Sequence, residues 1–253
     1  MKMKRLEGKV AIVTGGSRDI GRAISVKLAQ EGAKVCVNYC NSEADAKETL
    51  SIIEANGGTA IAVKGDMTKA ADVKALFAKT AEAFGDTLDV LVNVVGGIVG
   101  RKKIVEQDEE WYDFLMDLNM KSVFLCTREA VPMMKNGGSI INFSSQAARD
   151  GGGPGASVYA TAKAAVMCHT RAMAKELGPQ GIRVNALAPG MINTSFHDRF
   201  TKPEARENLH RTAPLRREGE ASEVADVVCF LACDESSYIT GDNIDINGGV
   251  LFS

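Results

Sequence analysis

The sequence has no long apolar stretch and no excess of charge of either sign. No run approaches the roughly 20 apolar residues that span a bilayer, and the start, MKMKRLEGKV, carries positive charge without the apolar core of a signal peptide. Lysine and arginine number 30 against 32 aspartates and glutamates, a net charge of -2, which argues against a nucleic-acid partner bound through a broad basic face. We expect neither a membrane nor a nucleic-acid partner.

The chain also lacks cysteines in metal-ligand spacing. Its 6 cysteines stand singly or as pairs four residues apart, and most lie in apolar runs, where buried free thiols are common. This pattern predicts a reduced, cytoplasmic protein without a metal site. The composition, 45% apolar and 25% charged, is that of an ordinary globular protein, and 253 residues suffice for one large domain, residues 1–253.

Short apolar runs rich in β-branched residues alternate with longer helical patterns, such as residues 20–32, 71–85 and 223–235. Runs that are apolar throughout are typical of parallel strands covered on both faces. The alternation predicts an α/β fold, a Rossmann-type, doubly wound parallel sheet of about seven strands in a three-layer α/β/α single domain. The strands are expected at residues 9–14, 34–39, 59–64, 88–93, 138–145, 182–188 and 243–247.

The first predicted strand leads into the glycine-rich segment TGGSRDIG, residues 14–21. Its glycines do not form G-x-G-x-x-G, because Arg18 stands at one of the required positions. A P-loop is excluded as well, since Arg22 and Ala23 replace Lys and Ser/Thr. The place of the segment, just before a helix N-terminus, favours phosphate binding. A plain strand-to-helix connection is the alternative.

The end of the second predicted strand lacks the acid that usually binds the adenosine ribose of NAD. The chain reads VNYCNSE, with Asn38 and Tyr39 at the strand end and the first acid at Glu43. Arg18 is suited to meet a 2′-phosphate, which an acid would repel; the alternative is a solvated surface charge. We expect NADPH to be favoured, with NADH as the alternative.

The stretch YATAK places Tyr159 and Lys163 four residues apart, on one face of a predicted helix. Tyrosine has a pKa near 10, and the neighbouring ammonium is expected to lower that pKa toward a useful range. Fourteen residues before Tyr159, the run NFSS ends a strand. Ser145 is therefore expected at the carboxyl edge of the sheet, where its hydroxyl can hydrogen-bond a developing oxyanion.

In this order and spacing, the segments resemble the short-chain dehydrogenase/reductase family over essentially the whole chain. TGGSRDIG stands where that family has TGxxxGxG, NVVG at residues 93–96 where it usually has NNAG, and Asp66 in GDM where an acid meets adenine. The pattern is completed by Asn119 in LNMKSVF, Ser145, Tyr159, Lys163, Pro189, Gly190 and Thr194.

The resemblance implies a carbonyl reductase with four catalytic residues. Ser145 would polarise the substrate carbonyl, and Tyr159 would donate the proton. Lys163 would hold the nicotinamide ribose and assist Tyr159, and Asn119 would anchor a water that relays protons. The implied cofactor-binding residues are Gly15, Ser17, Arg18, Ile20, Gly21, Asn38, Tyr39, Ser42, Asp66, Met67, Asn93, Gly96, Tyr159, Lys163, Pro189, Gly190, Ile192 and Thr194. Of these, Arg18 with Asn38 and Tyr39 would face the adenosine ribose.

Asp19 departs from the family pattern, since it replaces the second glycine of the motif. Aspartate tolerates unusual backbone angles and can cap a helix start. We therefore expect its carboxylate to turn toward the helix amides and away from the cofactor phosphates, so that the site survives. The change from NNAG to NVVG keeps Asn93 and Gly96.

Basic residues follow three of the predicted strands. They are Arg101–Lys103, Arg149, and the basic residues of FHDR at residues 196–199. FHDR lies in a segment that extends to about Arg216, and we predict this segment to be a substrate lid. Such residues can converge on an anion, for example a ketone or aldehyde that carries a carboxylate. A solvated run of charges is the alternative.

GGIVGRK, GGGPGASVY and NTSFH are similar to segments of the bacterial reductases of alginate breakdown, which act on 4-deoxy-L-erythro-5-hexoseulose uronate. This similarity implies a substrate site of Gly97, Arg101, Ser145, Gln146, Tyr159 and His197. The alternative within the fold is 3-oxoacyl-[acyl-carrier-protein] reductase, because an acidic carrier also suits a basic run. A homotetramer is expected from the family. A dinucleotide-binding sensor or scaffold is the non-enzyme alternative, which the four filled catalytic positions disfavour.

Overall fold

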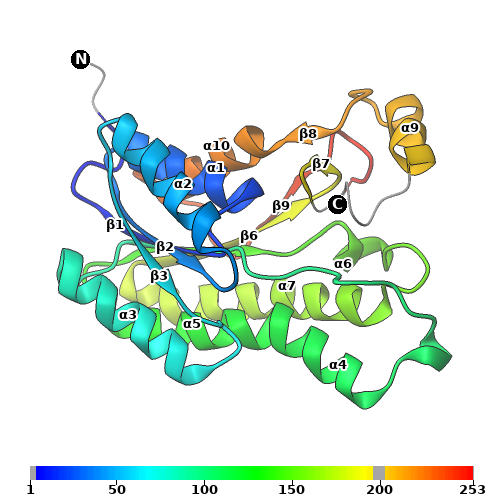
Figure 1. Cartoon of the computed structure of the whole chain (residues 1–253), viewed down its shortest axis with the longest axis horizontal. Coiled ribbons are helices and arrows are strands. Elements are labelled where there is room, and N and C mark those ends of the chain that lie inside the picture. Colours follow the sequence, from blue (N-terminus) through cyan, green and yellow to red (C-terminus); the bar gives the residue numbers. More distant parts are fainter. Residues whose placement is uncertain (1–3, 196–202, 253) are drawn as a thin grey trace.

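The central sheet is parallel and contains the predicted strands. In the computed structural model, which describes residues 4–195 and 203–252, these are β1 Val10–Thr14, β2 Lys34–Tyr39, β3 Thr59–Lys64, β4 Val90–Asn93, β5 Gly138–Phe143, β6 Ile182–Pro189 and β9 Asn243–Ile246. Within those residues they form a 7-stranded sheet in the order β3-β2-β1-β4-β5-β6-β9 (Figure 1). Strand order reverses between β1 and β4, and sheets of this type bind ligands in the crevice at that point.

Helices cover both faces of the sheet, which confirms the three-layer prediction (Figure 1). One face carries α1 Asp19–Gln30, α2 Glu43–Ala55 and α10 Ala221–Ala232, and the other carries α3 Ala70–Phe84, α4 Glu109–Met116, α5 Ser122–Ala130 and α7 Ser157–Leu177. Val13 of β1 packs with Ile24 of α1 and Val228 of α10. Its neighbour Ile12 lies in the other half of the core, with Leu76 of α3. Because both faces are covered, most positions of the inner strands are apolar.

Short elements follow β5 and β6, where the sequence shows no periodic pattern. They are α6 Ala147–Asp150, α9 Pro203–Thr212, and a small parallel pair of β7 Ile192–Asn193 with β8 Gly219–Glu220. Arg206 of α9 donates through two guanidinium nitrogens to the carboxylate of Glu218, each at 2.6 Å, and the Glu218 side chain is only 8% exposed. This bidentate ion pair fastens α9 to the chain just before β8.

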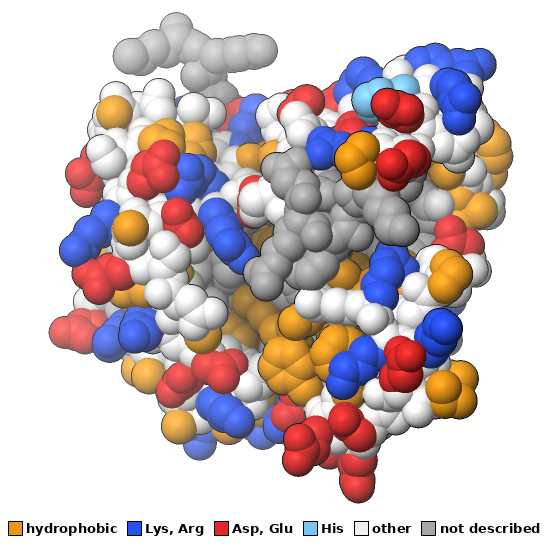
Figure 2. Space-filling model, turned by 45° about the vertical axis from the view of Figure 1, so that its right-hand side comes forward, with side chains coloured by type: hydrophobic (Ala, Val, Ile, Leu, Met, Phe, Trp, Pro, Cys, Tyr) orange, Lys and Arg blue, Asp and Glu red, His pale blue; other side chains and the backbone are white. Residues whose placement is uncertain are grey.

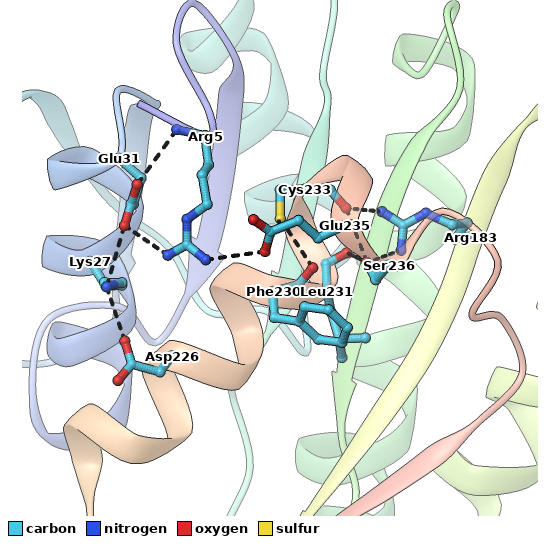
Figure 3. Close-up of polar contacts among 10 residues, drawn as sticks. All are labelled: Arg5, Lys27, Glu31, Arg183, Asp226, Phe230, Leu231, Cys233, Glu235 and Ser236. Carbon is cyan, nitrogen blue, oxygen red and sulfur yellow. Dashed lines mark hydrogen bonds and ion pairs between the residues drawn. The ribbon is translucent and has the colours of Figure 1, made fainter. Parts of the chain in front are cut away.

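A series of charged side chains joins the N-terminal segment to α1 and α10 (Figure 3). Arg5 donates to Glu31 at 2.7 Å, and Lys27 lies 3.3 Å from Glu31 and 3.0 Å from Asp226. The hydrogen bond from Arg5 lowers the pKa of Glu31 to about 2. Because these side chains are partly exposed, each pair contributes at most about 1 kcal/mol. Together they fix the position of α1, which begins at the glycine-rich segment.

The surface mixes charge of both signs with exposed apolar side chains. On the face shown in Figure 2, Lys and Arg alternate with Asp and Glu, and apolar side chains lie between them. Tyr112 and Phe114 of α4 and Phe124 of α5 are each close to half exposed. In the described part of the chain, no helix is long and apolar enough to cross a membrane.

Candidate active site

Polar side chains at the ends of β1, β4 and β5 form the floor of the site. Thr14 donates to the carbonyl of Val92 at 3.3 Å. Asn93 donates to Asn142 at 2.9 Å, and Asn142 donates to Thr170 of α7 at 2.9 Å. These side chains are buried and fix three strand ends and α7 relative to one another. Asn93 is among the residues predicted to bind the cofactor; in the structure its side-chain amide stabilises the sheet through the hydrogen bond to Asn142.

Glycines are required to build the turn of residues 14–21. Gly15 has a φ of 60°, and a Cβ on Gly21 would collide with the Gly15 carbonyl. The turn leads directly into α1, whose N-cap residue, Arg18, makes no side-chain cap hydrogen bond. The first-turn amides of α1 are thus left without a side-chain cap. Such a helix N-terminus fits a phosphate group, here the pyrophosphate of a dinucleotide.

Asn38 supports this turn from beneath. Its side chain is 1% exposed, its Oδ1 accepts from the amide of Gly15 at 3.1 Å, and its Nδ2 donates to the carbonyls of Val63 and Gly65 at 3.3 and 3.0 Å. The polar atoms of the Asn38 side chain are thus taken up by backbone groups, and only the backbone of Asn38 remains to face the ribose, as predicted for Asn38 with Tyr39. Tyr39, the next residue, is half-buried at the strand end.

Three further residues predicted to bind the cofactor have side chains engaged locally. Ser42 caps α2 by accepting from the amide of Asp45 at 3.2 Å, and Asp66 accepts from the amide and hydroxyl of Thr68 at 2.9 and 2.8 Å. Met67 is buried in the core. Arg18 has a side chain that is 69% exposed, and its Nε lies 3.9 Å from Oδ2 of Asp19. The exposed guanidinium is still suited to a 2′-phosphate. The preference for NADPH stays a prediction.

Asp19 does not cap α1. Its φ is 49°, in keeping with the tolerance of aspartate for such angles. Its two carboxylate oxygens accept from the amide of Ser195 at 3.1 Å and from the Ser195 hydroxyl at 2.6 Å. The expectation that the carboxylate turns toward the helix amides is wrong, because a residue beyond β7 binds it instead.

Asn119 lies in a π-helical turn, Asp117–Lys121 (η2), that joins α4 to α5. Its side chain accepts from the amide of Gly97 at 2.8 Å and donates to the carbonyls of Gly97 and Leu115 at 3.1 and 2.9 Å. A Cβ on the adjacent Gly96 would lie 2.7 Å from Asn119 Oδ1 and 2.8 Å from Lys163 Nζ. The Asn119 side chain thus positions the loop after β4, and Gly96 allows Asn119 and Lys163 to lie close together. π-Helical turns often occur at functional sites.

Tyr159 and Lys163 lie one turn apart on α7, as predicted. Lys163 is 3% exposed, and its Nζ donates to the carbonyl of Phe143, the last residue of β5, at 2.7 Å. Ser144 donates to the backbone carbonyl of Lys163 at 3.1 Å, which holds α7 against the strand end. The half-buried Ser145 follows and hydrogen-bonds Tyr159. Ser145, Tyr159 and Lys163 are therefore brought together.

Burial dominates the ionisation of Tyr159 and Lys163. It raises the pKa of the Tyr159 phenol, while the hydrogen bond with Ser145 and the charge of Arg101 act in the opposite direction. It lowers the pKa of Lys163 to about 8. The expectation of a lowered pKa for Tyr159 is wrong in this structure, since Lys163 Nζ lies 5.9 Å from the centre of the ring and burial outweighs the influence of its charge. A phenol that keeps its proton at neutral pH is suited to donate it.

Arg101 lies at the mouth of the site, near enough for its charge to lower the pKa of Tyr159. Its Nη1 donates to the carbonyl of Pro154 at 3.1 Å, and a Cβ on Gly153 would lie 3.3 Å from Nη1. The segment GGGPG, residues 151–155, therefore supports the guanidinium. Two stretches singled out in the sequence, GGIVGRK and GGGPG, meet at this point.

Of the other basic residues predicted at the rim, Lys102 and Arg149 make contacts elsewhere, Lys103 is exposed, and the FHDR residues lie outside the described residues. Lys102 Nζ lies 4.5 Å from the centre of the Trp111 ring, a cation–π contact. Arg149 lies 3.1 Å from the carboxylate of Asp245 on β9. The predicted convergence of Arg149 on an anion is wrong, because Asp245 neutralises its charge. His197, with the rest of FHDR, lies outside the described residues.

The remaining predicted residues lie at the ends of β5 and β6. The backbone amide of Gln146 donates to the carbonyl of Pro189 at 3.2 Å, and its side-chain Nε2 donates to Asp150 at 3.0 Å. A Cβ on Gly190 would lie 3.1 Å from Gln146 Oε1. Ile192 and Thr194 are buried. Gln146 therefore borders the site, whereas Ile192 and Thr194 form part of its wall.

Sequence reasoning missed Thr14, Asn142 and Ser195 as residues that shape the site. Thr14 was visible in the motif, and Asn142 is a polar residue within an otherwise apolar strand, which is a usable signal. Ser195 carries no such signal, because its partner Asp19 lies 176 positions away.

The glycine turn and the Ser145–Tyr159–Lys163 group together define a nicotinamide-dependent oxidoreductase that acts on CH–OH or C=O groups. Among the described residues, no group of three or more His, Cys, Asp and Glu side chains is arranged to hold a metal ion. Comparison with known proteins agrees with this class. A family model described as enoyl-(acyl carrier protein) reductase matches residues 15–251.

Relatives and solved structures cover nearly the whole chain. The chain is 40% identical over 244 residues to a 3-oxoacyl-[acyl-carrier-protein] reductase of Staphylococcus aureus, covering 96% of this chain and 98% of that one. A short-chain dehydrogenase/reductase structure from Serratia marcescens is 36% identical, with a TM-score of 0.91 and coverage of 97% and 98%. The structure of the promiscuous reductase LugOII, described as catalysing keto-reduction at C1 in lugdunomycin biosynthesis, is 43% identical, with a TM-score of 0.89 and the same coverage. The chain belongs to the short-chain dehydrogenase/reductase family.

Proposed function

We propose that this protein is an NADPH-dependent reductase of an anionic keto sugar acid, with 4-deoxy-L-erythro-5-hexoseulose uronate as substrate and 2-keto-3-deoxy-gluconate as product. One observation carries the proposal. The guanidinium of Arg101 lies near Tyr159 and is supported by the GGGPG segment. A guanidinium supported at the mouth of the site, where its charge acts on Tyr159, is suited to hold a carboxylate through charge-assisted hydrogen bonds.

In the proposed reaction, the substrate carbonyl oxygen lies between the hydroxyls of Ser145 and Tyr159. Ser145 donates a hydrogen bond that polarises the carbonyl, and Tyr159 transfers its phenolic proton to the oxygen as negative charge develops there. The ammonium of Lys163 stabilises the phenolate that remains. Asn119, with its side chain bound to Gly97, acts as a positioning residue for the loop that carries Arg101.

The cofactor would lie along the carboxyl edge of the sheet, with its pyrophosphate at the glycine turn. When bound, the reduced nicotinamide supplies hydride to the carbonyl carbon. Lys163 Nζ uses one of its three protons on the carbonyl of Phe143; its remaining protons are suited to the nicotinamide ribose. Arg18 would meet the 2′-phosphate, which favours NADPH over NADH.

A second candidate is the reduction of a 3-oxoacyl thioester. The observation that favours it is the 40% identity to 3-oxoacyl-[acyl-carrier-protein] reductases. In that case Arg101 would contact the acidic carrier or its phosphopantetheine arm, and the same Ser145 and Tyr159 chemistry would apply.

We further propose a cytoplasmic homotetramer. The location is supported by cysteines that are all free, four of them buried. The assembly is supported by the exposed aromatic side chains of α4 and α5, which a neighbouring subunit would cover. Light scattering at micromolar concentration gives the mass of the assembly; a mass of one chain contradicts the tetramer.

The substrate is tested by following NADPH oxidation with the uronate and, separately, with an acetoacetyl thioester. We expect turnover of the uronate, and Arg101→Gln to raise its KM at least about tenfold with a smaller change in kcat. Lys103→Gln is the matched control, because it removes the same charge from an exposed side chain two positions away. Preference for the thioester, or equal effects of both variants on the uronate, would contradict the proposal.

A further inference from the structure

The carboxylate of Asp19 joins the glycine turn to the segment after β7. Oδ1 accepts from the backbone amide of Ser195 at 3.1 Å, and Oδ2 accepts from the Ser195 hydroxyl at 2.6 Å. Both oxygens of one carboxylate therefore bind one residue, which fixes the separation and the orientation of the two segments. The family motif has a glycine at this position, so the contact is a property of this chain.

Each end of the contact is anchored in rigid structure. Asp19 is the first residue of α1, directly after the turn suited to the pyrophosphate. On the other side, Ser195 follows Thr194, whose buried hydroxyl donates to the carbonyl of Ile192 at 3.1 Å. Ile192 belongs to the hydrophobic core. The contact thus bridges two walls of the predicted dinucleotide cleft, one at the glycine turn and one formed by Ile192 and Thr194, which are both among the residues predicted to bind the cofactor.

We propose that Asp19 is a positioning residue that holds the Thr194–Ser195 wall at binding distance from the glycine turn before a dinucleotide enters. The inference rests on the dinucleotide site and is independent of which carbonyl compound is reduced. Because the wall is already ordered, binding of the dinucleotide does not have to include the free energy of ordering the wall. A larger fraction of the cofactor-free protein is then in the conformation that binds the dinucleotide.

The negative charge of Asp19, which Arg18 partly offsets with its Nε 3.9 Å from Oδ2, acts in the opposite direction near a pyrophosphate. If repulsion dominated, removal of the charge would tighten binding; if positioning dominates, removal of the contact weakens binding. The two effects therefore predict changes of opposite sign, and conservative variants separate them.

Three variants test the proposal. Asp19→Gly restores the usual motif residue, tolerates the φ of 49° and removes both hydrogen bonds. Asp19→Asn removes the charge but keeps an acceptor for the Ser195 amide and a donor for its hydroxyl. Ser195→Ala keeps the charge and removes one hydrogen bond. The Kd for NADPH is measured by calorimetry without carbonyl substrate, and the exposure of the Ser195 amide by hydrogen–deuterium exchange of the cofactor-free protein.

We expect Asp19→Gly to raise the Kd and the exchange rate of the Ser195 amide about tenfold, Ser195→Ala to raise the Kd about threefold, and Asp19→Asn to stay within about twofold of the parent. Tighter binding by both Asp19 variants would overturn the proposal, because repulsion would then dominate. If Asp19→Gly raised the Kd without faster exchange of the Ser195 amide, or sped this exchange without raising the Kd, the proposal would be overturned as well. In either case the order of the wall and the binding of the dinucleotide would not be coupled. These outcomes do not depend on the proposed uronate, since no carbonyl substrate is present.

Discussion

Gly96 is the position at which a single methyl group is expected to disable the site. In Gly96→Ala, the new Cβ would lie 2.7 Å from Asn119 Oδ1 and 2.8 Å from Lys163 Nζ, closer than real contacts allow. Asn119 is held by hydrogen bonds to Gly97 and Leu115, and Lys163 by Phe143, so neither side chain can move without losing a partner.

The magnitude of this effect has two parts. The φ of 154° at Gly96 disfavours any L residue by about 1–3 kcal/mol. Displacement of a hydrogen bond to a charged or buried group costs about 1.5–3 kcal/mol more. If the transition state loses this second part of about 1.5–3 kcal/mol, kcat/KM falls roughly ten- to hundredfold.

Gly85→Ala is the matched control. Gly85 has a φ of 99° and no heavy atom of a neighbour within 4 Å of a Cβ, so it carries backbone strain without a clash. Denaturant unfolding and steady-state kinetics on both variants separate the two parts. We expect both proteins to lose stability and Gly96→Ala alone to lose activity. A Gly96→Ala enzyme with kcat/KM within twofold of the parent would refute the placement of Asn119 and Lys163 beside Gly96.

Two further predictions concern Lys163 and Asn38. Burial lowers the pKa of Lys163 to about 8, so kcat/KM for reduction should fall as pH rises through that value, because the neutral amine no longer stabilises the phenolate. Lys163→Arg should abolish this break in the pH–rate profile. A break that persists in the variant would belong to another group. Because the unfolded chain holds the Lys163 proton up to about pH 10.5, this residue's contribution to the free energy of unfolding rises between pH 8 and 10.5. Asn38→Asp should lower the unfolding midpoint and weaken NADPH binding, since a carboxylate would face the carbonyls of Val63 and Gly65; unchanged binding and stability would contradict its role beneath the turn.

The sheet could be predicted because each strand carries its own signal. The runs at 34–39 and 59–64 coincide with β2 and β3, because each has an uninterrupted apolar centre: residues 35–37 of β2 are buried, and residues 60–63 of the edge strand β3 are at least partly buried. The pair of Tyr159 and Lys163 was equally visible, because helical spacing alone places them on one face.

Features that depend on distant residues could not be predicted. The burial of Asn38 follows from how β3 packs beside β2, and the contact of Asp19 with Ser195 follows from the path of the chain after β6. The π-helical turn at Asn119 has no local sequence signal either, because it depends on how the helix packs against the loop after β4. The pKa of Tyr159 was misjudged for the same reason, since burial is a property of the folded chain.

The proton-donor role of Tyr159 is the central claim, and Tyr159→Phe tests it most directly. This variant keeps the ring and its packing while it removes the phenolic proton. With NADPH binding measured alongside turnover, we expect kcat to fall about hundred- to ten-thousandfold and the Kd for NADPH to stay within twofold. Turnover equal to that of the parent would contradict the assignment of Tyr159 as the proton donor and, with it, the proposed mechanism.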